Sequence, residues 1–391
     1  MLVPHSQRSA QTAGWLDGPV PGAGPAARAP APAARQGAAP QPRCPVLLLS
    51  PSSGLGGGIE RYVETIQTSL RFLGLTADRL DLHQDRQSRT HTAHRGLYRR
   101  VRAQLTGDRE PARLVVAHMN LLPTALAAAR RRDIDGITVV LHGAEFWSAT
   151  RHNVIYRMLA RRGVRPVAVS GFSAGALFPR VRAMVLPPGL SPEWFATLVA
   201  AAHAPREARP GVRLMTSFRL SGWREKGLPA LVEAIRLTGR TDIQLTVCGS
   251  GAPEPELDEL ITATPFCSLR SNLPDADLAA EFAAADLFVL ATRLQNAPIA
   301  AGEGFGLVLL EAQVAGTPVV APAYGGSSDA FRAGVTGASP ADQSPQALAR
   351  VLGEILSDPQ RIGEMGIAAA AWSREQFHPA RYAALACARL L

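Results

Sequence analysis

Two acidic residues, Glu303 and Glu311, flank a predicted turn and helix start in the second half of the chain. Glu311 shares one helical face with Leu307 and Val314, so its side chain is expected to point inward. A buried carboxylate is costly unless it is hydrogen-bonded, and a helix start favours an anionic ligand. This pattern predicts a site for a polyhydroxylated ligand that carries phosphate. The alternative is a solvated Glu303 and a Glu311 paired to an arginine elsewhere.

The segment from Glu303 to Glu311 closely resembles the E-x7-E signature of the retaining glycosyltransferases of family 4, which have the GT-B fold. The resemblance implies that the first Glu and the backbone after it face the donor sugar and its diphosphate. In this chain those residues are Glu303, Gly304, Phe305, Gly306 and Leu307. It also implies that Glu311 binds the ribose hydroxyls of the nucleotide.

Lys226 is the only lysine among the 41 Lys and Arg residues of the chain. A lysine that persists among arginines indicates a site that needs a compact ammonium, such as a phosphate cradle. Arg219, seven positions earlier, is expected to end a strand. The two residues resemble the Arg…Lys-Gly pair of family 4, which binds the donor diphosphate, although five positions are usual there. Ordinary loop salt bridges are the alternative; the resemblance implies catalysis without a metal.

His142 follows a predicted strand and is expected to face the cleft. It resembles the family's histidine near the donor sugar and the reaction centre, whereas a lone histidine is more often structural. His118 also ends a predicted strand, and we expect it to be structural or part of a wall. The pairs Asp133–Asp135 and Asp275–Asp277 match a D-x-D metal motif literally, but such pairs are frequent by chance and we expect no metal site.

Two further segments are similar to donor-binding segments of the family. Gly57 and Gly58, followed by Glu60 and Arg61, resemble its Gly-Gly-x-Glu-Arg loop, although a tight turn without a ligand is equally common. Ser271 and Leu273 stand where the family reads the base, mainly through the backbone. Residues 325–329 resemble its Gly-Gly-x-Pro-Glu turn, with Ser328 and Asp329 in place of Pro and Glu.

Apolar runs that alternate with helical patterns predict parallel sheets with helices on both faces. The first series of strands is expected at residues 46–49, 114–117, 137–141 and 167–170. The second is expected at residues 212–217, 245–248, 287–290 and 318–321. The predicted fold class is therefore α/β, with two doubly wound Rossmann-like domains that face a cleft.

The composition changes along the chain predict five segments. They are a disordered Ala/Pro/Gly-rich tail at residues 1–42, a Rossmann-like domain at 43–188, a linker at 189–210, a second Rossmann-like domain at 211–375, and a C-terminal helix at 376–391. The resemblance implies that the first domain lies on the acceptor side, that the second binds the nucleotide sugar, and that the C-terminal helix packs back on the first domain. No stretch is long and apolar enough to predict a membrane span or a secretory signal. Four scattered cysteines favour a reduced, cytoplasmic protein.

The charge is unevenly distributed. Residues 43–188 hold 22 Arg against 10 Asp and Glu, a net charge of +12, whereas residues 189–391 hold 16 Arg and Lys against 21 acidic residues, a net charge of −5. The basic half suits an anionic partner or a solvated Arg-rich surface. Basic helices around Leu97–Leu105 and Val154–Leu159 could lie on an anionic membrane, but apolar faces packed in the core are the favoured interpretation.

The resemblance implies a retaining, metal-independent transfer from a nucleoside diphosphate sugar to an acceptor hydroxyl, with the sugar nucleotide as substrate and no cofactor. The acceptor can be a secondary metabolite, a glycan or a lipid-linked molecule, and a nucleic-acid partner is not expected. Two alternatives stay open. One is a sugar-nucleotide epimerase of similar architecture, and the other is a non-catalytic nucleotide- or carbohydrate-binding protein.

Overall fold

The computed structural model describes residues 46–52, 58–83, 90–106, 112–130, 134–143, 145, 152–205, 209–295 and 302–391. Residues 43–391 form one compact unit. The predicted tail, Gly57 and Asp133 lie outside the described residues.

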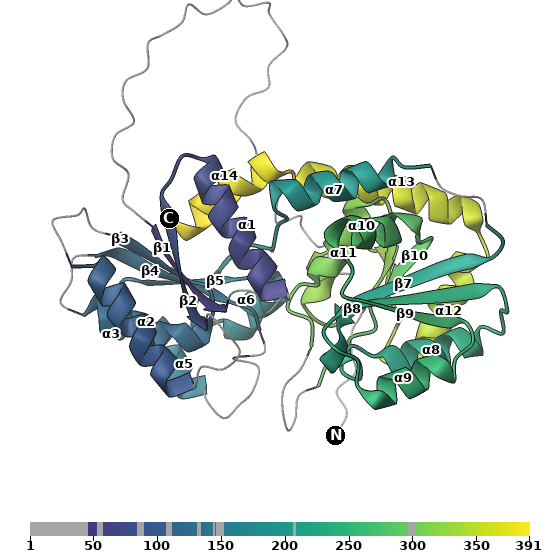
Figure 1. Cartoon of the computed structure of the whole chain (residues 1–391), viewed down its shortest axis with the longest axis horizontal. Coiled ribbons are helices and arrows are strands. Elements are labelled where there is room, and N and C mark those ends of the chain that lie inside the picture. The colour runs from purple at the N-terminus through teal and green to yellow at the C-terminus, as the bar shows by residue number, and fades with distance from the viewer. Residues whose placement is uncertain are drawn as a thin grey trace, which may run out of the picture. The chain divides into compact units, whose positions relative to one another are not determined.

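The first half is a parallel sheet in the order β2-β1-β3-β4-β5-β6 (Figure 1). Its strands are β1 (Val46–Ser52), β2 (Ala77–His83), β3 (Ala112–Val116), β4 (Ile134–Leu141), β5 (Val164–Ala168) and β6 (Met184–Val185). Its helices are α1 (Gly58–Phe72), α2 (Thr90–Gln104), η1 (Met119–Leu121), α3 (Leu122–Ala129), α5 (His152–Leu159) and α6 (Gly171–Leu177). The central strands are continuous apolar runs, as expected of a sheet covered on both faces.

The second half repeats the design with the order β12-β11-β10-β7-β8-β9. Its strands are β7 (Val212–Arg219), β8 (Ile243–Ser250), β9 (Cys267–Ser271), β10 (Leu287–Val289), β11 (Val319–Val320) and β12 (Gly337–Ala338). Its helices are α7 (Pro192–Ala202), η3 (Leu220–Gly222), α8 (Leu228–Leu237), α9 (Pro255–Thr262), α10 (Asp275–Ala284), α11 (Leu307–Val314), η4 (Gly326–Asp329), α12 (Pro345–Leu356), α13 (Pro359–Gln376) and α14 (Pro379–Leu390). All the strand pairs are parallel, so two doubly wound sheets confirm the predicted fold class.

Two helices connect the halves. The segment predicted as a linker contains α7, which packs on α10 and α11, so this stretch is largely helical and packed. At the C-terminus, α14 packs against α1, and Thr138 of β4 donates a hydrogen bond to the Leu390 carbonyl at 2.8 Å. The predicted domain limits themselves stay a prediction.

The basic helices place apolar residues in the core. Leu97 and Val101 of α2 are fully buried. In α5, Ile155 and Leu159 are buried, whereas Val154 is exposed. Most of the predicted apolar stripe therefore packs inside the first half, and the arginines lie on the other sides of these helices.

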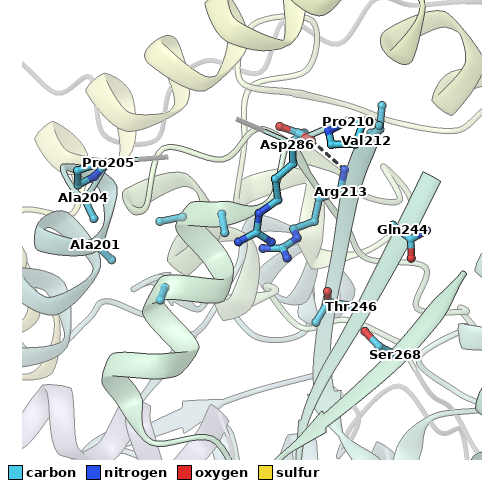
Figure 2. A pocket seen from close by; sticks show the side chains of 15 residues that line it. Ala201, Ala204, Pro205, Pro210, Val212, Arg213, Gln244, Thr246, Ser268 and Asp286 are labelled. Atoms are coloured by element: carbon cyan, nitrogen blue, oxygen red, sulfur yellow. Dashed lines mark hydrogen bonds between the residues drawn. The ribbon is translucent and has the colours of Figure 1, made fainter. Parts of the chain in front are cut away.

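The two faces of β8 differ in character. Ile243, Leu245 and Val247 pack in an apolar cluster with α8, as a doubly wound sheet requires. Gln244 and Thr246 lie on the opposite face, where they border a cavity (Figure 2).

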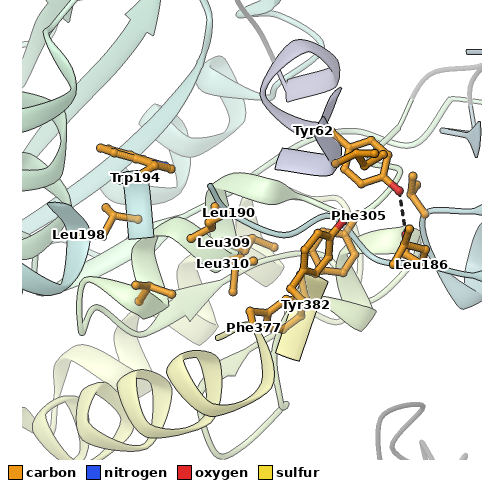
Figure 3. Packing of buried hydrophobic residues seen from close by; sticks show 14 of the residues in the cluster. Tyr62, Leu186, Leu190, Trp194, Leu198, Phe305, Leu309, Leu310, Phe377 and Tyr382 are labelled. Atoms are coloured by element: carbon orange, nitrogen blue, oxygen red, sulfur yellow. Dashed lines mark hydrogen bonds between the residues drawn. The ribbon is translucent and has the colours of Figure 1, made fainter. Parts of the chain in front are cut away.

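An apolar cluster holds the turn before α11 in place. Phe305 and Leu310 are buried in the same apolar cluster as Tyr62 and Tyr382, and the Tyr62 hydroxyl donates to the Leu186 carbonyl at 3.4 Å (Figure 3). This packing joins α1, α11 and α14, and it fixes the direction in which α11 enters the cleft.

Candidate functional site

A cavity of about 740 Å³ lies at the carboxyl ends of both sheets and takes residues from both halves. This is where doubly wound sheets bind ligands, because the loops that follow the strands meet there. The first half contributes Gly58, Glu60, Arg61, His83, His94, His118 and Asn120 among others. The second half contributes Arg219, Lys226, Asn272, Leu273, Glu303, Leu307, Val308 and Glu311 among others.

The predicted turn and helix of residues 303–311 form one wall of this cavity. Gly306 is the N-cap of α11 and has a φ of +89°, a conformation that favours glycine. Glu303, Leu307, Val308 and Glu311 line the cavity, whereas Phe305 packs in the core. The start of α11 therefore borders the space, together with two carboxylates.

Glu311 is only 4% exposed and has two partners. The Trp194 indole N–H donates to its Oε1 at 2.9 Å, and an Arg61 terminal nitrogen lies 3.6 Å from the same oxygen. Burial raises the pKa of the Glu311 carboxyl, and Arg61 and the Trp194 N–H oppose that rise. An internal ion pair therefore exists, as the alternative interpretation supposed, but the pair borders a cavity with room for a ligand.

Arg61 joins the two halves at the edge of the cavity. Its guanidinium lies 2.7 Å from Asp275 of α10 and stacks 4.7 Å over the Trp194 ring. Burial acts to lower the pKa of Arg61, but the carboxylates of Glu311 and Asp275 outweigh it, so the pKa is raised. Arg61, Trp194, Asp275 and Glu311 thus form one polar cluster.

Lys226 and Glu303 form the second polar contact of the wall. The Lys226 Nζ donates to Glu303 Oε2 at 2.8 Å, and the Thr292 hydroxyl donates to the same oxygen at 3.2 Å. Gly227, the N-cap of α8, approaches so closely that an added Cβ would lie 2.0 Å from the Ala291 carbonyl oxygen. This close approach fixes the turn that carries Lys226.

Arg219 ends β7 and is exposed at the cavity. The structure thus brings the pair Arg219 and Lys226 to the same space as the pair Glu303 and Glu311, although the two pairs are far apart in the sequence. The longer spacing between Arg219 and Lys226 is filled by the short helix η3.

His142 lies beside the cavity and not among its lining residues. Its ring Nε2–H donates to the Ala117 carbonyl at 2.8 Å, and its ring stacks on His118 at 5.9 Å. An added Cβ on Gly304 would lie 2.1 Å from the His142 carbonyl oxygen, so the backbone of His142 touches the Glu303 turn. His118 lines the cavity, and burial lowers its pKa.

The loop after β9 forms the wall at the predicted base site. Asn272 has a φ of +55°, and its side chain exchanges hydrogen bonds with the backbone of Gly251 at 2.8 and 3.1 Å. Asn272 and Leu273 line the cavity, whereas Ser271 is exposed outside the lining. Asn272 therefore holds the loop and presents Leu273.

The remaining predicted residues have the following places. Gly58 lines the cavity at the start of α1. The Gly171 backbone N–H donates to Asp329 at 2.5 Å, a contact between the first half and the turn after β11. Asp275 pairs with Arg61, and Asp135 pairs with Arg113. Among the described residues, no three His, Cys, Asp or Glu side chains are grouped to hold a metal ion.

Trp194 is the site residue that sequence reasoning missed. It lies inside the predicted linker, and a single tryptophan in an Ala-rich stretch carries no signal of its own. Its partner Glu311 is 117 positions away, a contact that only the fold reveals.

Within the part of the chain that the structure describes, no helix is long and apolar enough to cross a membrane.

The chain is similar in sequence to several known proteins. Residues 219–372 match the family "Glycosyl transferases group 1". The chain is 30% identical over 214 residues to the GDP-mannose-dependent alpha-(1-6)-phosphatidylinositol monomannoside mannosyltransferase of Mycolicibacterium smegmatis, which is 52% of this chain and 55% of the relative. It is 35% identical over 201 residues to the D-inositol 3-phosphate glycosyltransferase of an Arthrobacter species, covering 48% of this chain and 44% of the relative. The chain thus spans about half the length of these curated relatives.

Solved structures share the fold over most of the chain. The HepE protein of Anabaena, solved with UDP and glucose, has a TM-score of 0.65 at 19% identity and covers 88% of this chain and 98% of its own. Sucrose-phosphate synthase from Thermosynechococcus elongatus has a TM-score of 0.70 at 17% identity, with 88% and 97% covered. Residues 219–372 are therefore similar to the glycosyl transferases group 1 family, and the chain has the GT-B fold.

Proposed function

We propose that the chain is a glycosyltransferase that moves a sugar from a nucleoside diphosphate to an acceptor hydroxyl, with retention of the anomeric configuration. One observation carries the proposal: Lys226, Glu303 and Glu311 line one cavity together with Arg219. Two cations and two carboxylates that face the same space suit a ligand with both phosphates and hydroxyls. The group 1 match includes all four residues.

In this proposal, Arg219 and Lys226 bind the diphosphate. Their positive charges compensate the charge that develops on the leaving phosphate, which is the role a metal ion has in many phosphate sites. We therefore propose that the reaction is independent of a metal. Lys226 would exchange part of its contact with Glu303 for the phosphate, which frees Glu303 to accept hydrogen bonds from the donor sugar.

The nucleoside would lie between α11 and the loop after β9. Glu311 Oε1 holds Arg61 and Trp194, and its Oε2 is the oxygen proposed to accept the ribose hydroxyls. The N–H groups at the start of α11 add a partial positive charge on the phosphate side. Leu273 would pack against the base.

The proposed chemistry breaks the bond between the anomeric carbon and the diphosphate oxygen, and forms a bond from that carbon to the acceptor oxygen. The acceptor attacks on the face from which the diphosphate leaves, and a phosphate oxygen takes the acceptor proton. Retention rests on the resemblance of Glu303–Glu311 to the family-4 signature.

His142 is proposed as a positioning residue beside the donor sugar, because its ring is held by Ala117 and its backbone touches Gly304.

The acceptor proposed is a polyhydroxylated molecule bound against the first half. The two relatives named above act, by their names, on a phosphatidylinositol mannoside and on inositol 3-phosphate, which supports this class. A cytoplasmic location and contact of the Arg-rich half with an anionic membrane are part of the same proposal.

The test is a donor screen by thermal shift with UDP and GDP sugars, followed by an assay for released nucleoside diphosphate with and without polyol acceptors. The proposal predicts stabilisation by one nucleotide sugar and acceptor-dependent release, with an anomeric configuration by NMR equal to that of the donor. Conversion of the donor alone into an epimer would favour the epimerase, and binding without turnover would favour a binding protein.

A further inference from the structure

A second cavity of about 580 Å³ lies at the opposite, amino ends of the strands of the second half. It shares no lining residue with the cavity described above. Its walls are the end of α7, residues 204–205 and 209–211, the end of α10, and the starts of β7, β8 and β9. Ala201, Ala280, Ala283 and Ala284 face it with small side chains, which leave the space open.

Among the described residues, Arg213 is one of two arginines that line this space. Figure 2 shows its side chain extending from β7 into the hollow. Its backbone N–H donates to Asp286 at 2.8 Å, while its guanidinium has no hydrogen bond or ion pair to any of the described residues. A half-buried guanidinium without a partner is uncommon, because its donors lose water without compensation.

The sheet face behind Arg213 is polar where a doubly wound sheet is usually apolar. Register aligns Arg213 with Gln244, and Thr246 with Ser268, so four polar side chains form a block on one face of three adjacent strands. Thr246 is 6% exposed, and its hydroxyl bonds to no group in the described residues. These hydroxyl and amide groups suit the hydroxyls of a ligand.

The charges at this cavity favour an anion. Arg209 and Arg213 are its cations and Asp286 its one carboxylate among the described lining residues, which leaves a net charge of +1. Planar guanidinium groups suit phosphate, which they can bind with two parallel hydrogen bonds. We propose that this cavity is a binding site for a small sugar phosphate, with the phosphate on Arg213 and the hydroxyls on Thr246, Ser268 and Gln244.

Two helices connect the residues that hold Arg61 and Glu311 at the first cavity with the second cavity. α7 carries Trp194 near its start and ends with Ala201 and Ala202 at the second cavity, and α10 begins with Asp275 beside Arg61 and ends with Ala284. The two helices pack against each other. A ligand at the second cavity therefore contacts the same helices that hold Glu311 and Arg61 at the first.

The test is calorimetric titration of the full chain with glucose 6-phosphate, with inorganic phosphate and glucose as the partial ligands. Glucose 6-phosphate is expected to bind and glucose is not. Arg213→Gln should weaken the binding about tenfold or more, the size of a lost charge-assisted hydrogen bond. Thr246→Val should weaken it by less, since one neutral hydroxyl is removed.

Arg219→Gln is the matched control, because Arg219 is the last residue of β7, the strand that carries Arg213 near its start, and lies in the first cavity. It should leave glucose 6-phosphate binding unchanged, whereas Arg213→Gln should leave the binding of UDP or GDP unchanged. Repeating the titration with saturating nucleotide separates the two sites. Three results would each overturn the proposal. They are full competition between nucleotide and glucose 6-phosphate, an affinity for glucose 6-phosphate in Arg213→Gln and Thr246→Val equal to that of the wild type, and no binding of glucose 6-phosphate at millimolar concentration.

Discussion

The Arg61 guanidinium lies 3.6 Å from Glu311 Oε1 and 2.7 Å from Asp275, so one side chain of the first half pairs with two helices of the second. This relationship gives the buried Glu311 carboxylate a compensating charge before any ligand binds. The cation next to the proposed ribose site, Arg61, therefore comes from α1 of the first half, whereas Glu311 comes from α11 of the second.

Arg61→Gln should make nucleotide binding more dependent on pH. Burial raises the pKa of Glu311 above its usual value, and Arg61 limits the rise, so the variant should raise it further. Between the unfolded and the folded pKa of Glu311, the folded chain binds more protons than the unfolded chain. The free energy of unfolding therefore falls as the pH rises through this window and then becomes constant. Because the ionised carboxylate is the better acceptor for ribose hydroxyls, nucleotide affinity should rise over the same window.

The measurement is the nucleotide dissociation constant and the melting temperature from pH 4.5 to pH 8 for wild type and Arg61→Gln. Glu311→Gln is the control, because its side chain does not titrate. Any pH dependence that remains in this variant comes from groups other than Glu311, such as the phosphates of the nucleotide. Identical profiles for the wild type and Arg61→Gln would contradict the assigned role of Arg61.

Trp194→Phe should weaken nucleotide binding several-fold while the chain stays folded. The change removes the N–H that donates to Glu311 at 2.9 Å but retains an aromatic ring beneath Arg61. A hydrogen bond to a charged group contributes about 1.5–3 kcal/mol. The phenyl ring retains the packing against Arg61, so only the contribution of the hydrogen bond is lost. Trp223→Phe is the matched control, since the Trp223 indole N–H donates to Glu254 outside the cavity. Equal nucleotide affinity of the two variants would argue against the contact.

Lys226→Ala should abolish turnover and leave the fold intact. Its side chain is 30% exposed, and its ammonium bonds only Glu303 among the described residues, so its loss removes a ligand contact more than a structural one. Lys226→Arg should remain strongly impaired, because a guanidinium cannot occupy the geometry of a compact ammonium. The check is the rate of diphosphate release together with circular dichroism, and full activity of Lys226→Ala would remove the diphosphate assignment.

Gly304→Ala should destabilise the chain and impair turnover. The added Cβ would lie 2.1 Å from the His142 carbonyl oxygen, and a backbone atom cannot rotate away. The cost is about 1–3 kcal/mol if the backbone shifts, and the shift would move Glu303. Gly353→Ala is the control: it lies in α12 with no atom within 4 Å, and alanine favours a helix by about 1 kcal/mol. Thermal melting should give a lower midpoint for Gly304→Ala only.

The sequence predicts the parts of this site that are local in the chain. The Gly-hinged turn, the inward direction of Glu311 and the strands made of apolar runs all follow from spacing within about ten residues. The four edge strands β2, β6, β9 and β12 were missed, because edge strands such as Cys267–Ser271 carry few buried apolar residues. The partners of Glu311 could not be predicted, since Arg61 and Trp194 reach it only once α1 and α7 pack against α11.

The most direct test of the account is a calorimetric titration of UDP and GDP into the wild type, Glu311→Ala and Glu311→Gln. The account predicts tight binding of one nucleotide by the wild type and about tenfold to a hundredfold weaker binding by Glu311→Ala, since charged hydrogen bonds to the ribose are lost. Glu311→Gln should fall between the two. Unchanged affinity in Glu311→Ala, with the protein folded, would contradict the proposed nucleotide site.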